Sequence, residues 1–276
     1  MKIFITGVAG FLGSHLADLM IAQGHKVAGN DNMIGGYADN VPQGVEFHQV
    51  DCCDLENLTK AMEGCDIVYH TAATAYEGLS VFSPVLVTRN IFEASVTTIT
   101  AAIRNNVKRI VYCSSMARYG HHDKMPYRED YECRPQDPYG IAKKAGEDVL
   151  KNLCETHGVE YVIAVPHNIV GPRQKYDDPF RNVMSIMLNR MLQGKQPIIY
   201  GDGEQQRCFS YIDDCLYCLN ALAFQDDVVG EVVNIGPDEE SCTINDLAEM
   251  CANETGLNLD VLYHKDRPQE VKIAVC

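Results

Sequence analysis

Six runs of apolar and β-branched residues alternate with helix-like segments over the first 165 residues, and this alternation limits the fold more than any other feature. The runs read KIFITG, HKVAGND, VEFHQVD, DIVYHTAA, RIVYCSS and EYVIAVP. Short buried strands separated by helices are typical of a parallel sheet that is covered on both faces. We therefore expect a doubly wound α/β domain over residues 1–165, with a ligand crevice at the carboxyl ends of its strands. Its helices should begin near Leu12, Leu55, Val85 and Tyr139.

The rhythm changes after Pro166. A loop-like GPRQKYDDP is followed by a helical FRNVMSIMLNRMLQG, a strand and turn in PIIYGDG, and a second helical stretch, TINDLAEMCANETG. Thr243 or Ser241 would cap that second helix. We expect a smaller mixed α/β lobe over residues 166–276 that binds the substrate, with room for some of its segments to return to the first domain. The two lobes should share a broad interface with a cleft between them.

The bulk properties exclude several classes of protein. The formal net charge is −15, whereas nucleic-acid binding depends on basic surfaces. No apolar stretch is long enough to cross a bilayer, and the N-terminus enters a strand without the features of a signal peptide. We expect a cytoplasmic protein with no nucleic-acid or membrane partner.

The cysteines and histidines do not predict a metal site. The twelve cysteines are scattered through strand-like and helix-like segments, so reduced thiols are expected. Cys215 and Cys218 form a C-x-x-C pair, but no second pair follows at a spacing that zinc could use. His121, His122 and Asp123 lie in a polar loop of the kind that is usually solvated surface.

Gly7, Gly10 and Gly13 lie between the first strand and the first helix, in TGVAGFLGSHL. Glycine lets the backbone turn tightly there and approach a ligand, and the unpaired N–H groups of the helix start favour a phosphate. Asp31 follows Gly13 by eighteen positions, at the end of the second strand. A carboxylate at that place accepts hydrogen bonds from ribose hydroxyls and repels a 2′-phosphate, which favours NAD over NADP. Asp51, at the end of the third strand, could reach the adenine side.

Tyr139 and Lys143 are four residues apart at the start of a predicted helix, so their side chains share one face. A phenol ionises near pH 10, but a neighbouring ammonium favours the phenolate and makes tyrosine a usable general base. The fifth strand brings Ser114 and Ser115 to the same crevice. This combination predicts chemistry at the carboxyl edge of the sheet.

Together, TGVAGFLGSHL, the DN after the second strand, HTAA, SSMARYG and YGIAKK identify a family. The chain resembles the extended short-chain dehydrogenases/reductases, and among them the NAD-dependent nucleotide-sugar epimerases and dehydratases of the UDP-glucose 4-epimerase type. The resemblance covers nearly the whole sequence. It implies a Rossmann-type fold, NAD as cofactor and a nucleotide-diphosphate sugar, UDP-linked, as substrate.

The resemblance also assigns roles to residues. Ser115, Tyr139 and Lys143 would be catalytic, and Ser115, Tyr139, Asn168, Arg207 and Arg267 would bind the substrate, with the last three gripping its diphosphate. The cofactor would contact Gly7, Gly10, Phe11, Leu12, Gly13, Asp31, Asn32, Asp51, Cys52, Ala72, Tyr139, Lys143 and Pro166. In this scheme the sugar is oxidised at C4 to a 4-keto intermediate, and hydride returns to its other face, so the cofactor is recycled.

Single residues argue for or against other activities on the same fold. The family's dehydratases carry Asp-Glu where this chain has Met116 and Ala117, which cannot exchange protons. A decarboxylase of sugar uronic acids would use a further cation for the carboxylate; Arg118 lies near that loop, but we expect an ordinary role for it. Asp31 disfavours an NADP-linked reductase. A non-catalytic NAD sensor would have no need of the intact Ser115, Tyr139 and Lys143.

Substrate choice and assembly are also expectations from the resemblance. Counting from Arg267 places Ala274 at a position that gates the space beside the sugar's C2, and its small side chain leaves room for N-acetylhexosamines. Ala75, Tyr76 and Glu77 are further candidates for specificity. Family members pair the helices that correspond to residues 85–105 and 139–156, so we expect a homodimer. The resemblance leaves open whether the C-terminus is complete.

Overall fold

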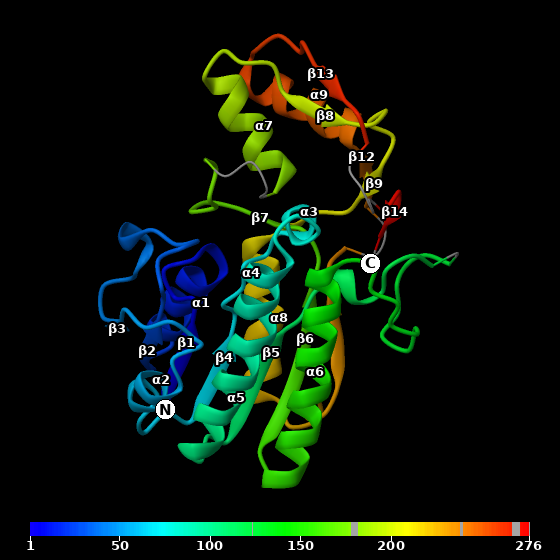
Figure 1. The fold of residues 1–276 in the computed structure, drawn as a ribbon. Helices are drawn as coiled ribbons and strands as arrows, with labels where there is room; N and C mark the ends of the chain where they lie inside the picture. Colours follow the sequence, from blue (N-terminus) through cyan, green and yellow to red (C-terminus); the bar gives the residue numbers. More distant parts are fainter. Residues whose placement is uncertain (123, 178–181, 238–239, 267–270, 276) are drawn as a thin grey trace.

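The computed structural model describes residues 1–122, 124–177, 182–237, 240–266 and 271–275. Asp123 of the His-rich loop and Arg267, an expected diphosphate ligand, lie outside the described residues. Figure 1 shows a large sheet with helices on both sides and a smaller lobe above the carboxyl ends of its strands.

The large sheet has seven strands, and every neighbouring pair is parallel. The strands are β1 (Lys2–Thr6), β2 (Lys26–Asn30), β3 (Glu46–His48), β4 (Ile67–His70), β5 (Arg109–Cys113), β6 (Glu160–Pro166) and β11 (Val232–Ile235), in the spatial order β11-β6-β5-β4-β1-β2-β3. The expected doubly wound α/β fold is confirmed. Chain order reverses between β1 and β4, and a sheet of this kind binds its ligand at that reversal.

The seventh strand comes from the part of the chain that the sequence assigned to the second lobe. Strand β11 pairs with β6, with Val232 opposite Ile163, and helix α8 (Ile212–Phe224) packs on the same sheet before it. The return of these segments to the sheet was left open by the sequence, because a strand of four residues carries little periodicity.

Two groups of helices cover the sheet. Helices α1 (Phe11–Ala22) and α8 pack together on one face, through Leu16, Met20 and Leu219 among others. On the other face lie α2 (Leu55–Ala61), α5 (Ala94–Arg104) and α6 (Pro138–His157); α5 and α6 are in front of the sheet in Figure 1. The helix expected from residue 85 is divided into α4 (Pro84–Thr88), a π-helical turn η2 (Arg89–Glu93) and α5.

Local sequence explains where the main site helix begins and ends. The Asp137 carboxylate caps α6 by accepting a hydrogen bond from Gly140 N–H at 2.9 Å, and Pro138 occupies the first helical position. Both residues are typical of helix starts. Gly158 ends α6 in the left-handed conformation, at φ +70°, where glycine has no Cβ penalty.

The small lobe is mixed α/β, as expected. Helices α7 (Val183–Leu192) and α9 (Ile244–Thr255) pack through Met187, Met191 and Leu247. Thr243, one of the two expected caps, forms a capping box with Asp246. The short strands are β7 (Ile169–Val170) beside β10 (Ser210–Tyr211), β8 (Ile198–Tyr200) beside β13 (Leu262–His264), and β9 (Gln206–Arg207) between β12 (Cys242–Thr243) and β14 (Ile273–Ala274).

In the described part of the chain, no helix is long and apolar enough to cross a membrane. Within the same residues, His, Cys, Asp and Glu side chains form no group of three that could hold a metal ion.

Candidate active site

A cleft of about 610 Å³ opens at the carboxyl ends of the sheet strands, and both lobes line it. Every expected site residue within the described part of the chain lies on its wall. From the first lobe these are Gly7, Gly10, Phe11, Leu12, Gly13, Asp31, Asn32, Asp51, Cys52, Ala72, Ser115, Tyr139, Lys143 and Pro166, and from the second Asn168 and Arg207. The fold therefore brings together residues that are scattered over two hundred positions of sequence.

The glycine turn between β1 and α1 is built for close approach. Gly7 has φ +71°, and a Cβ at Gly13 would lie 2.3 Å from the Gly7 carbonyl oxygen, so neither position accepts a side chain without a shift. Gly10 is the N-cap of α1 and has no side chain to bond the first-turn N–H groups. Those donors are available to an anion, which fits the pyrophosphate of a dinucleotide.

Asp31 lies beside this turn at the end of β2 and is 7% exposed. Its Oδ2 accepts a hydrogen bond from Ala9 N–H at 3.1 Å, and its Oδ1 accepts one from Met33 N–H at 2.7 Å. The two backbone donors hold the carboxylate at the rim of the cleft. A fixed negative charge there fits ribose hydroxyls and opposes a 2′-phosphate.

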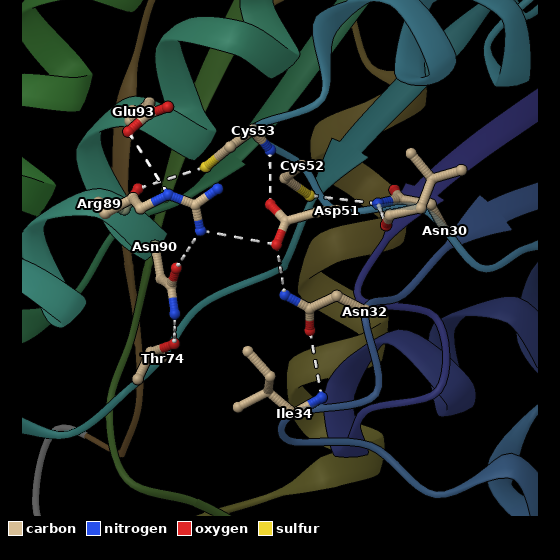
Figure 2. A network of polar contacts seen from close by, with 11 residues as sticks. Asn30, Asn32, Ile34, Asp51, Cys52, Cys53, Thr74, Arg89, Asn90 and Glu93 are labelled. Carbon is tan, nitrogen blue, oxygen red and sulfur yellow. Dashed lines mark hydrogen bonds and ion pairs between the residues drawn. The ribbon is translucent and has the colours of Figure 1, made fainter.

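Asn32, the residue after Asp31, belongs to a polar network that runs through Asp51 to Arg89 of η2 (Figure 2). Asp51 accepts hydrogen bonds from Asn32 Nδ2 at 3.0 Å and from Cys53 N–H at 2.8 Å, and Arg89 Nη1 lies 3.7 Å from it. Burial raises the pKa of Asp51, but these donors and the Arg89 charge outweigh burial and hold the pKa below its usual value. Asp51 is therefore ionised and already oriented at this end of the cleft.

The candidate catalytic side chains come from α6 and from the turn after β5. Tyr139 is 6% and Lys143 2% exposed, one helical turn apart. Lys143 Nζ donates a hydrogen bond to the Cys113 carbonyl at 2.7 Å, and burial lowers the pKa of Lys143 to about 8. Ser115 caps the 3-10 helix η3 (Met116–Arg118), where its Oγ accepts a hydrogen bond from Ala117 N–H at 3.2 Å.

His70, at the end of β4, supports this region and was missed by the sequence analysis. Its Nδ1 lies 2.9 Å from Thr6 Oγ1 and its Nε2 lies 3.1 Å from Ser95 Oγ. Burial, together with the nearby Lys143 charge, lowers the pKa of His70 to about 3. The ring is therefore neutral and structural; a histidine that ends a fully apolar strand was the available signal.

The second lobe supplies polar side chains to the opposite wall. Asn168 Nδ2 donates to the Cys208 carbonyl at 3.1 Å, and Arg207 Nη2 donates to the Val271 carbonyl at 2.7 Å. Lys175 and Arg190 also line the cleft, although no sequence pattern singled them out. Arg190 comes from α7 and Lys175 from the chain before it, so only the packing of the second lobe places them in the cleft.

Ala274 lies in β14 directly opposite Arg207 in β9, and it lines the cleft. Ala75, Tyr76 and Glu77, the other candidates for specificity, line the cleft as well. Arg118 does not: its guanidinium is buried and paired with Glu147. This placement agrees with the ordinary role expected for Arg118.

A doubly wound parallel sheet with a glycine turn, an acidic residue after the second strand and a Tyr-Lys pair in one cleft defines a nucleotide-dependent short-chain dehydrogenase/reductase. The model of the NAD dependent epimerase/dehydratase family matches residues 3–236, and the chain belongs to that family. The resemblance inferred from sequence is confirmed, and the cofactor is NAD.

Solved structures and a curated relative agree with this assignment. The chain is similar to the UDP-glucose 4-epimerase of Thermotoga maritima, with a TM-score of 0.94, 30% identity, and coverage of 100% of this chain and 89% of that one. It is similar to the UDP-N-acetylglucosamine 4-epimerase of Methanobrevibacter ruminantium, with a TM-score of 0.92, 32% identity and coverage of 99% and 88%. A UDP-N-acetyl-alpha-D-glucosaminuronate decarboxylase of Bacillus cytotoxicus is 29% identical over 90% of this chain and 78% of its own length.

Proposed function

We propose that the protein is a C4 epimerase of a UDP-hexose or UDP-N-acetylhexosamine, acting through a transient 4-keto sugar. The observation that carries this proposal is the meeting of Ser115, Tyr139 and Lys143 in a cleft whose other end holds the glycine turn and Asp31. A base, an ammonium and a hydroxyl group at one end of a dinucleotide site suit the reversible oxidation of a secondary alcohol.

Each catalytic side chain has a defined task in this scheme. NAD, when bound, supplies the acceptor and then the donor of the C4 hydride. Tyr139 as phenolate takes the proton of the C4 hydroxyl and later returns it, while Ser115 Oγ donates a hydrogen bond to the same oxygen. Lys143, fixed by the Cys113 carbonyl, stabilises the phenolate by its charge.

The second lobe would hold the nucleotide diphosphate. Arg207 and Asn168 face the cleft, and guanidinium groups pair with phosphate oxygens in a bidentate manner. Arg267 keeps its expected role in this proposal, although it lies outside the described residues. Arg190 and Lys175 add positive charge to the same wall.

The alternatives are disfavoured by particular side chains. Met116 and Ala117 line the cleft beside Ser115, and neither can serve as the acid or base that a dehydratase requires. Arg118 is paired with Glu147 at 2.9 Å and does not line the cleft, so it does not supply the carboxylate contact of a uronic acid decarboxylase. The burial of Tyr139 and Lys143 together argues against a non-catalytic sensor, because a buried ammonium is costly without a task.

We also propose that the protein is a homodimer that pairs α4, η2 and α5 with α6. Phe82, Val85, Leu86 and Ile141 on this side are exposed apolar side chains, and exposed apolar groups on helix faces favour association. The cytoplasmic location stays a prediction from the sequence.

Incubation of the purified protein with UDP-glucose and, separately, UDP-N-acetylglucosamine tests the function, with no cofactor added and the products separated by chromatography. We expect both C4 epimers to form, because the cofactor is recycled and Ala274 leaves space beside C2. Turnover of the hexose alone would contradict the role given to Ala274. No turnover of either sugar by protein that retains NAD would overturn the proposed substrate class.

A further inference from the structure

Arg118 and Glu147 form a buried ion pair next to the turn that carries Ser115. Arg118 Nη2 lies 2.9 Å from Glu147 Oε2, and the two side chains are 4% and 0% exposed. The Ser114 hydroxyl donates a hydrogen bond to the other carboxylate oxygen of Glu147, Oε1. One buried carboxylate therefore holds the residue before Ser115 and the residue three positions after it.

Stability alone does not explain a buried ion pair of this kind. Removing two charges from water costs several kcal/mol per ion, and apolar residues of similar size are often as stable or more stable. Neither Arg118 nor Glu147 lines the cleft, so substrate contact does not explain the pair. What the pair does is join two elements that carry catalytic side chains.

Those two elements are η3 with its preceding turn and helix α6. Tyr139, Lys143 and Glu147 are spaced by four residues on α6 and share one face. Ser115 lies on the other element, between the two residues that Glu147 holds. The carboxylate thus links the turn that carries Ser115 to the helix that carries Tyr139.

Burial raises the pKa of Glu147, against the Arg118 charge and the Ser114 hydroxyl, which lower it. Burial also lowers the pKa of Lys143, against Cys113 and Glu147, which raise it. The charged and titratable groups that act on Glu147 are Arg118, Lys144, Lys151, Tyr112 and Cys133, and those that act on Lys143 also include His70 and Cys113. Removal of the Glu147 charge therefore leaves the buried Arg118 without the carboxylate with which it is paired.

We propose that Glu147 is a positioning residue for the epimerase reaction, which holds the turn that carries Ser115 against α6, the helix that carries Tyr139 and Lys143. This inference rests on the proposed function for its kinetic readout. It assigns no substrate contact to Glu147.

The test compares E147Q with E155Q, a matched control in the same helix. Glu155 is exposed and lies about two turns further along α6. In E147Q we expect kcat to fall by about 100-fold, since small displacements of catalytic groups have effects of this size, while KM and NAD content stay near wild type. E155Q should behave as wild type. A folded E147Q with wild-type kcat would overturn the proposal.

A second readout does not need the substrate. The ionisation of Tyr139 in the NAD-bound protein is followed by tyrosinate absorbance, as the difference between each protein and its Y139F counterpart. The Cys113 carbonyl that fixes Lys143 directly precedes Ser114, which Glu147 holds. A displaced turn therefore moves Lys143 relative to Tyr139, and the Tyr139 transition should move to higher pH by about one unit in E147Q. An unmoved transition would overturn the placement of Lys143 by this turn. If wild-type protein turns over no UDP-sugar, the proposed function fails while this titration still decides the role of Glu147.

The double variant R118M/E147L covers the case in which E147Q does not fold. It removes both charges together, which buried pairs usually tolerate. A positioning role predicts a stable protein with the same loss of kcat, whereas a purely structural pair predicts wild-type turnover.

Discussion

The Lys143 side chain, with its ammonium group, is almost completely buried. It is 2% exposed, and the Cys113 carbonyl is its hydrogen-bond acceptor. Burial lowers the pKa of Lys143 to about 8, against the opposing effects of Cys113 and Glu147, so the group remains substantially charged near neutral pH. The ammonium can therefore act on the residue one helical turn before it, Tyr139, by favouring the phenolate.

The Y139F variant removes the Tyr139 hydroxyl oxygen and tests whether that group is the general base. Loss of the Tyr139 hydroxyl should lower kcat by 10²–10⁴-fold, the range for loss of a general base, with NAD content unchanged. Steady-state epimerisation assays with retained cofactor measured by absorbance give both quantities. The control Y217F alters an exposed tyrosine and should be silent. Y139F with more than about a tenth of wild-type kcat would contradict a proton-transfer role.

Helix α6 is the element that sets the site, and its N-terminus is fixed from two directions. Asp137 Oδ1 accepts hydrogen bonds from Gly140 N–H at 2.9 Å and from Ser80 Oγ at 3.4 Å, the latter in α3 (Glu77–Ser80). Gly140 in turn has no room for a side chain, because a Cβ would lie 2.6 Å from the Ala117 carbonyl oxygen in η3. The first turn of α6, which holds Tyr139, therefore packs against both α3 and η3.

The Asp137 cap of α6 leads to a prediction about this helix. D137A should lower the free energy of unfolding by about 1 kcal/mol, as caps generally do, and should also lower kcat because Tyr139 lies two residues away. D54A removes the equivalent cap of α2, where Asp54 accepts from Asn57 N–H at 3.2 Å. Urea denaturation and turnover are measured for both variants. D54A should lose stability alone; equal kcat losses in the two would refute a local effect of the α6 cap.

At the scale of the whole molecule, His70 ties the centre of the sheet to α5 and makes stability depend on pH. Its folded-state pKa is about 3, below the ordinary 6.5. Between these two values the unfolded chain binds a proton that the folded protein does not. The stability due to a neutral His70 is therefore complete above pH 6.5 and is lost as the pH falls toward 3.

The H70N variant should flatten this acid dependence. Wild-type protein should lose up to about 1.4 kcal/mol of unfolding free energy per pH unit from this group below pH 6.5. Urea unfolding at pH 7, 6 and 5 measures the slope, and H157N, which alters an exposed histidine at the end of α6, should keep the wild-type slope. An H70N slope equal to that of wild type would show that other groups cause the acid loss.

Much of the fold and the site could be read from local pattern. The six strands, the glycine turn and the i,i+4 Tyr-Lys pair are local features, and the structure places the described residues among them in one cleft. Other features depend on distant partners. The return of β11 to the sheet, the neutral state of His70 and the cleft positions of Lys175 and Arg190 follow from packing that no short window of sequence contains.

The sequence by itself determined the parallel sheet, the NAD site and the identity of the side chains available for chemistry, because periodicity, glycine placement and helical spacing act over a few residues. Only the tertiary structure decided what Arg118 does. The sequence indicated an ordinary residue near the substrate loop without naming its partner, and in the fold it is paired with Glu147 at 2.9 Å. The reason is physical: a charge that leaves water must find its counter-charge, and the packing of η3 on α6 determines which one it meets.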